Sequence, residues 1–159
     1  AFEDASRVAP NLVAPREEAA RLYQAEGRTR EAIEQLEAIA ALEADRPERQ
    51  AAVALAHARS GRADTAIRVL GRAAERYPDN AVIYLALGRV WLESAEPRRD
   101  RFGLGKALEA LEPLTHGPMT SGDALALYGR TLVVSGDLAG GGARRRRGRD
   151  RRPPDPGWG

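Results

Sequence analysis

Apolar residues recur along most of the chain at the spacing of helix faces, and small apolar residues return among them at a fixed interval. Gly27-Arg28 is followed by Ala32-Ile33, and the same order returns 34 residues later as Gly61-Arg62 and Ala66-Ile67. A period of 34 residues is typical of a repeat made of two antiparallel helices. The pattern therefore predicts an all-α fold, an α-solenoid of stacked helix-turn-helix repeats, without strands.

The 34-residue frame divides the chain into successive repeats. It predicts complete repeats at residues 13–46 and 47–80, and a third at 81–120 that carries an insertion at about 95–102. Residues 121–138 fit the first helix of a fourth repeat. Residues 1–12 read as the end of a truncated preceding repeat, so we expect the chain to be an internal piece of a longer array.

Glycine, alanine and proline recur where helices of this frame begin, end or cross. Alanine pairs such as Ala54 and Ala66 allow the two helices of a repeat to approach closely. Gly27, Gly61 and Gly136 are expected to close first helices with a positive φ. Pro15 and Pro47 fit the first turn of a helix, whereas Pro78 ends one. Thr120 and Asp123 have the spacing of a capping box.

The segment Pro97–Arg101 is an insertion, because the next apolar positions, Ala107 to Leu114, arrive about seven residues late. Insertions in solenoids lie in loops. We expect a solvated extended turn; a loop that contacts a partner is the alternative.

The C-terminal segment, residues 139–159, loses the apolar periodicity and is rich in Gly, Arg and Pro. It holds seven Arg and two Asp, a net charge of +5, whereas residues 1–138 have a net charge of −3. Such a composition predicts disorder. The Arg run could bind phosphates non-specifically, but aromatic residues for base stacking are lacking apart from Trp158, so nucleic acid is not the expected partner. A shifted reading frame would also produce this abrupt change.

The composition excludes several other classes of protein. The absence of Cys excludes disulfide scaffolds and cysteine-ligated metals, and no apolar run is long enough for a membrane span. His57 occupies a core position and His116 lies near a helix end, so no metal, cofactor or catalytic residue is expected. Gly103–Lys106 lacks the spacing and the Ser or Thr of a phosphate-binding loop. We expect a soluble protein, with the cytoplasm slightly favoured over the periplasm.

The repeats resemble those of the tetratricopeptide repeat family. The second repeat matches the family pattern at most of its positions, with Gln50 and His57 as departures, and the third opens with four matching residues. The matching residues are Val53, Ala54, Gly61, Ala66, Leu70, Ala73 and Pro78, then Tyr84, Leu87, Gly88 and Trp91. The resemblance implies a right-handed superhelix. The high ratio of Arg to Lys, 24 to 1, indicates a GC-rich, bacterial genome.

In that family the first helix of each repeat lines a concave groove that binds peptides. The resemblance therefore implies a non-catalytic scaffold that binds a peptide or helix of a partner protein. By position, the groove residues are Glu17, Arg21, Gln24, Leu55, Arg59, Leu85, Arg89, Leu92 and Arg130, with Glu48, Glu93, Asp123 and Val133 beside them. The Arg side chains would hold carboxylates or carbonyls, and the Leu side chains would take apolar residues.

Three alternatives remain at this point. The Arg residues could be ordinary solvated groups, and the repeats could be a regulatory or docking module of a larger enzyme or secretion machine. Self-association is also expected, because an uncapped solenoid leaves apolar surface at its ends, here residues 1–12 and 121–138.

Overall fold

The computed structural model describes the backbone of residues 2–149 and the side chains of residues 12–138. Within that range the chain forms seven α-helices and one short 3-10 helix, and no strand. The α-helices are α1 (Phe2–Ala25), α2 (Thr29–Leu42), α3 (Pro47–Arg59), α4 (Ala63–Arg76), α5 (Ala81–Ala95), α6 (Arg101–Leu111) and α7 (Gly122–Arg149), with η1 (Glu112–Leu114) after α6. The predicted all-α solenoid is confirmed.

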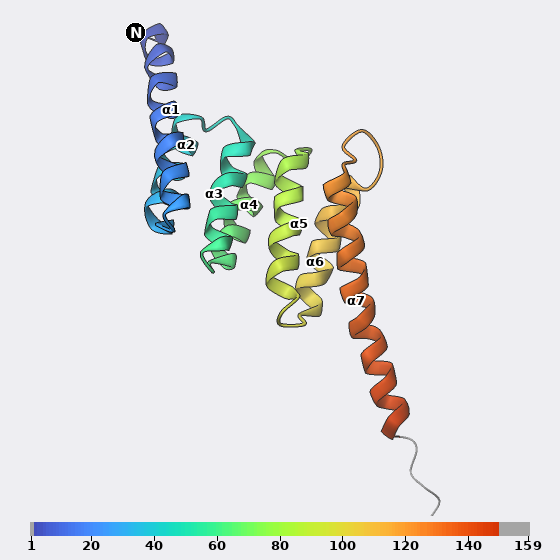
Figure 1. The fold of residues 1–159 in the computed structure, drawn as a ribbon. Coiled ribbons are helices and arrows are strands. Elements are labelled where there is room, and N and C mark those ends of the chain that lie inside the picture. Colours follow the sequence, from blue (N-terminus) through green and yellow to red (C-terminus); the bar gives the residue numbers. More distant parts are fainter. Residues whose placement is uncertain (1, 150–159) are drawn as a thin grey trace, which may run out of the picture.

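The helices pack as antiparallel pairs that stack side by side. α1 pairs with α2, α3 with α4, and α5 with α6, while α2, α4 and α6 each also pack against the next odd-numbered helix. In Figure 1, α1, α3, α5 and α7 lie in front, and α2, α4 and α6 lie behind them. We call the surface of the four front helices the A-helix face.

Small residues hold the pairs together at short range, as the sequence predicted. Ala54 and Ala66 are both fully buried, in a core that also contains Leu70 and Ile83. Gly27 and Gly61 follow α1 and α3 with φ values of 72° and 80°, which confirms their role in ending first helices. These turns fix where each second helix begins.

Two helices approach each other closely at Gly88 in the third pair. A Cβ atom placed on Gly88 of α5 would lie 2.5 Å from Cδ2 of Leu111 on α6. Leu111 is fully buried, so its side chain has no free space to move into. The absence of a side chain at Gly88 therefore sets the separation of α5 and α6.

The insertion in the third pair lengthens the turn, and α5 is also longer than α3. α5 has 15 residues where α3 has 13, and the turn has five residues, Glu96 to Asp100, where Ser60 to Arg62 suffice after α3. Asp100 caps α6, since its side chain accepts a hydrogen bond from Phe102 N at 3.0 Å. Gly103–Lys106 lies within α6, so this glycine pair is part of a helix and forms no loop.

Three expectations differ from the structure. α1 is one helix from Phe2 to Ala25 and runs through Pro10 and Pro15, where the frame predicted a boundary between two helices. An interior proline removes one backbone hydrogen bond, so α1 continues through both positions at a cost in helix stability. Pro15 consequently lies inside a helix and does not begin one.

At the other end, α7 does not stop near Gly136 and extends to Arg149. Disorder was predicted from residue 139, whereas the helix continues through Gly140, Gly141 and Gly142; residues 150–159 lie outside the described residues. The cap of α7 is Ser121, whose Oγ accepts a hydrogen bond from Ala124 N at 3.2 Å. The predicted cap, Thr120, donates instead to the Gly117 carbonyl at 2.9 Å.

Candidate functional site

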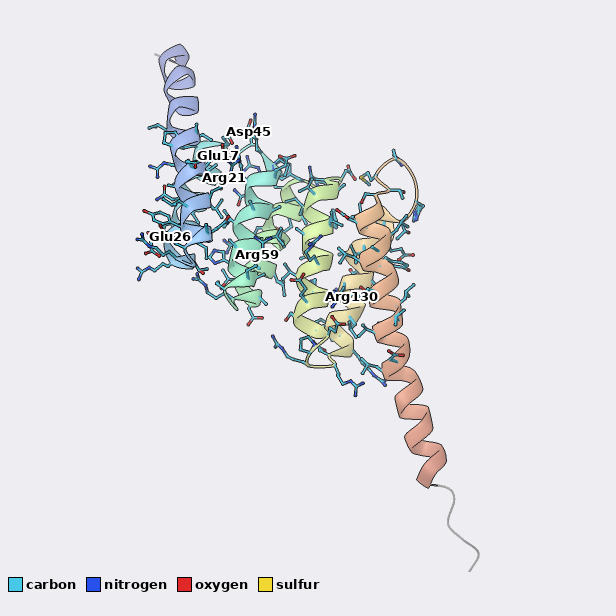
Figure 2. The ribbon with its side chains drawn as sticks, in the orientation of Figure 1. Glu17, Arg21, Glu26, Asp45, Arg59 and Arg130 are labelled. Carbon is cyan, nitrogen blue, oxygen red and sulfur yellow. The ribbon has the colours of Figure 1, made fainter. Side chains whose placement is uncertain are left out.

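The predicted groove residues come from the four helices of the A-helix face, and the structure divides them into different groups. Figure 2 shows Glu17, Arg21, Arg59 and Arg130 spread over this face from α1 to α7. They therefore do not form one cluster, and each position has its own surroundings.

The stacking of the front helices is uneven. α3 packs against α5, and α5 packs against α7, whereas α1 packs against α2 alone. An ion pair of 2.8 Å between Arg49 Nη2 and Glu17 Oε1 connects α1 to α3. Because α1 does not pack on α3 as α3 packs on α5, space is left beside α2.

A cavity of about 230 Å³ occupies this space between α1, α2 and α3. Its lining includes two predicted groove residues, Gln24 of α1 and Arg59 of α3, both exposed. The rest of the lining is Thr29, Ala32, Ile33 and Ala56. We call this the α1–α3 cavity.

The lining of the α1–α3 cavity combines an apolar floor with a polar rim. Ala32, Ile33 and Ala56 are buried, and Gln24, Thr29 and Arg59 are exposed. Among the described side chains, no carboxylate lies within 4 Å of the Arg59 guanidinium. A cavity with this lining can hold a small apolar side chain and pair a nearby carboxylate or carbonyl with Arg59.

Glu17 is part of an ion-pair network with Arg49 and Glu43. Arg49 of α3 bonds both Glu17 of α1 and Glu43, which follows α2. Partial burial lowers the pKa of Arg49, but its hydrogen bonds and charge attraction to Glu43 and Glu17 outweigh that effect and raise the pKa. Glu17 is thus engaged in holding α1, α2 and α3 together.

The arginines predicted for the groove on α1, α5 and α7 differ in pairing. Arg21 lies 3.7 Å from Glu18 on the same helix, with both side chains more than three-quarters exposed, so this pair is weak. Arg130 of α7 forms an ion pair with Glu96, which follows α5. Arg89 is half-buried, and no described carboxylate lies within 4 Å of it.

The leucines predicted for the groove also differ. Leu55 and Leu85 are half-buried on the A-helix face. Leu92 is fully buried and packs in a core with Ala95, Leu104 and Ala107. The prediction that Leu92 contacts a partner is therefore wrong. Leu127 and Val134 of α7 pack against the same cluster, so α5, α6 and α7 together enclose Leu92.

The cavity residues of α2 were missed by the sequence reasoning, which assigned the groove to first helices only. Thr29, Ala32 and Ile33 follow the Gly27 turn directly. Ala32 and Ile33 belong to the repeated motif itself, so the only available signal marked them as core residues.

His57 occupies the position where the repeat pattern has an aromatic residue, and it is buried as predicted. Its Nε2 lies 3.2 Å from Glu37 Oε1 of α2, and its Nδ1 is buried without a hydrogen-bond partner. The described residues contain no group of three or more His, Cys, Asp or Glu that could hold a metal ion.

Stacked helix pairs with small residues at the crossings define the class of the protein as a helical repeat solenoid. Residues 47–90, which cover α3, α4 and the first part of α5, match the family model described as tetratricopeptide repeat. The chain is thus a repeat protein of the tetratricopeptide type, and repeats of this type are in general modules for protein–protein interaction. No curated protein matches the chain. None of the described helices is both long and apolar enough to cross a membrane.

Proposed function

We propose that the chain is a non-catalytic interaction module that binds a segment of a partner protein on its A-helix face, centred on the α1–α3 cavity. The observation that carries this proposal is the meeting of Gln24 and Arg59 at a cavity with an apolar floor. Two helices of one repeat and the first helix of the next build it, so it exists only because the repeats stack.

The charges and sizes at this cavity indicate which segment it suits. Its volume of about 230 Å³ is enough for one or two side chains. The buried Ala32, Ile33 and Ala56 favour a small apolar residue there. Arg59 has no carboxylate partner among the described side chains and presents a planar donor, which favours an acidic residue or a carbonyl next to that apolar residue.

The neighbouring part of the face supports the same kind of partner. Leu55 and Leu85 offer half-buried apolar surface on α3 and α5, and Arg89 adds a second guanidinium without a carboxylate. Arg130 is less available, because it is paired with Glu96. The partner segment would therefore run from the α1–α3 cavity across α3 towards α5.

Affinity capture with matched variants tests this proposal. The wild-type chain, Arg59→Glu and Arg30→Glu are immobilised and exposed to lysate of the source organism. Arg30 is a suitable control, because it is exposed on α2, pairs with Glu34 and does not line the cavity. Both substitutions change the charge equally.

We expect wild type and Arg30→Glu to recover equal amounts of a specific protein. Arg59→Glu should recover at least tenfold less of that protein. Loss of one charge-assisted contact and its replacement by repulsion is sufficient for an effect of this size. Equal recovery of every protein by all three would show that the α1–α3 cavity is not the binding site.

A further inference from the structure

A second cavity lies on α4, behind the A-helix face. Its volume is about 440 Å³, and it is bounded by α4, the start of α3 and the turn that follows α2. The residues that line it are Ala44, Gln50, Thr65, Arg68, Val69, Arg72, Ala73, Arg76 and Tyr77. We call it the α4 cavity. Three arginines and no carboxylate line it.

The arginines of the α4 cavity stand in a row along one helix. Arg68, Arg72 and Arg76 are four residues apart, so they lie one above another about 6 Å apart on one side of α4. Like charges at this spacing destabilise a helix. The row is therefore not explained by the stability of α4 alone.

Internal partners do not neutralise the row. Arg68 donates to Thr65 Oγ1 at 3.3 Å, and the Arg76 guanidinium lies 5.5 Å from the centre of the Tyr77 ring. No described carboxylate lies within 4 Å of the three guanidiniums. On α2, by contrast, Arg30 lies 3.2 Å from Glu34.

The side chains that line the cavity indicate whether a nucleic acid or an acidic protein segment fits it better. Single-stranded nucleic acids bind to proteins by stacking bases on aromatic side chains. The one aromatic residue in the lining is Tyr77, whose ring lies near Arg76 and whose hydroxyl donates to the Ala44 carbonyl at 3.3 Å. The hydroxyl bond holds the Tyr77 ring, and the lining offers no second aromatic side chain, so successive bases have no stacking platform in the cavity. This favours an acidic protein segment.

The spacing and volume favour an extended segment over a helix. In an extended chain, alternate side chains project to the same side roughly 6.6 Å apart, close to the separation of the arginines. The row from Arg68 to Arg76 is about 12 Å long, and a helix with side chains is about 10–12 Å across. A helix of that length would therefore need roughly two to three times the volume of the cavity.

We propose that the α4 cavity binds an extended acidic segment of a partner protein, with carboxylates at alternate residues that pair with Arg68, Arg72 and Arg76. Guanidinium and carboxylate groups form paired, charge-assisted hydrogen bonds. Between these ion pairs, Val69 and Ala73 contact the backbone of the bound segment. This surface lies on a different helix from the α1–α3 cavity, so each proposal can fail without the other.

A fluorescence assay on the full chain tests the proposal. The chain contains no cysteine, so Asp79→Cys, an exposed position just after α4 and outside the cavity lining, accepts a single dye. The probe is a peptide of alternating Ser and Glu with three Glu and a terminal quencher. Quenching reports binding near α4, and its dependence on Arg72 distinguishes the cavity from other arginines of the chain.

The comparison uses two charge variants and two control probes. Arg72→Glu removes the central guanidinium, and Arg30→Glu makes the same charge change on α2. One control peptide has the same composition with its three Glu contiguous, and the other probe is a quencher-labelled oligothymidine. Circular dichroism verifies that both variants are helical.

We expect saturable quenching by the alternating peptide at 50 mM NaCl, weakened at least tenfold by Arg72→Glu and less than twofold by Arg30→Glu. The contiguous peptide should bind several-fold more weakly, and added salt should reduce all binding. Equal binding by both variants, equal binding of both peptides, or tighter Arg72-dependent binding of oligothymidine would overturn the proposal.

Discussion

Gly88 provides the sharpest test of how the helices pack, because α5 and α6 are closest there. In Gly88→Ala, the added Cβ would lie 2.5 Å from Leu111 Cδ2 and closer still to Leu111 Cγ. Leu111 is fully buried and cannot turn away into solvent. Overpacking of this kind costs about 1–3 kcal/mol.

A second effect of the same substitution has the opposite sign. Replacing an interior helix glycine by alanine gains roughly 0.8–1 kcal/mol of helix propensity. The net result is a free energy of unfolding lowered by up to about 2 kcal/mol, equivalent to a fall of up to roughly 6 °C in Tm for a chain of this size. Gly71 is the matched control, because it lies inside α4 and a Cβ there would meet nothing within 4 Å.

The assay is urea denaturation followed by circular dichroism at 222 nm, with hydrogen exchange of α5 and α6 to locate the change, since a solenoid can unfold in parts. Gly71→Ala should stabilise the chain by up to about 1 kcal/mol. In a Leu111→Ala background the obstacle is gone, so Gly88→Ala should become stabilising as well. If Gly88→Ala stabilises the wild-type chain as Gly71→Ala does, the close approach of α5 and α6 is refuted.

Three further predictions concern the turns, the core and the exposed end of the solenoid. Gly61→Ala forces a Cβ into a backbone with φ of 80° and should lower the free energy of unfolding by about 1–2 kcal/mol. Urea denaturation measures this against Gly71→Ala, and equal stability of the two variants would contradict the prediction. Leu70→Ala should cost about 2–5 kcal/mol in the same assay, because Leu70 is fully buried between the second and third pairs, whereas a cost below about 1 kcal/mol would place it outside the core. Leu132 is 47% exposed on α7, so we expect the chain to self-associate and Leu132→Glu to reduce this association. Sedimentation velocity at several concentrations measures it, and a wild-type chain that is monomeric at all of them would contradict the prediction.

The fold could be predicted from the sequence because its signals are local and repeated. Ala54 and Ala66 recur at the frame positions and are both fully buried. Gly27 and Gly61 have the positive φ that their place after first helices requires. Each signal depends on one helix pair and its immediate neighbour, which a 34-residue period specifies well.

The site was predicted less well, because the groove positions assume that every repeat stacks alike. α1 does not pack on α3, which opens the α1–α3 cavity and brings α2 residues such as Ile33 into its lining. In the third pair α5 packs against both α6 and α7, and Leu92 is enclosed between these three helices. Both departures depend on contacts between whole helices, for which a single sequence carries no local signal.

The most direct measurement of the proposed function is site-specific crosslinking from the α1–α3 cavity. A photoreactive phenylalanine analogue replaces Gln24, which lines the cavity, or Gly105, an exposed position on α6 with open space around it. Under illumination in source lysate, we expect Gln24 to give a crosslink to a specific protein that Gly105 does not give and that Arg59→Glu abolishes. The same crosslinked proteins from both positions, unchanged by Arg59→Glu, would contradict a binding site on the A-helix face.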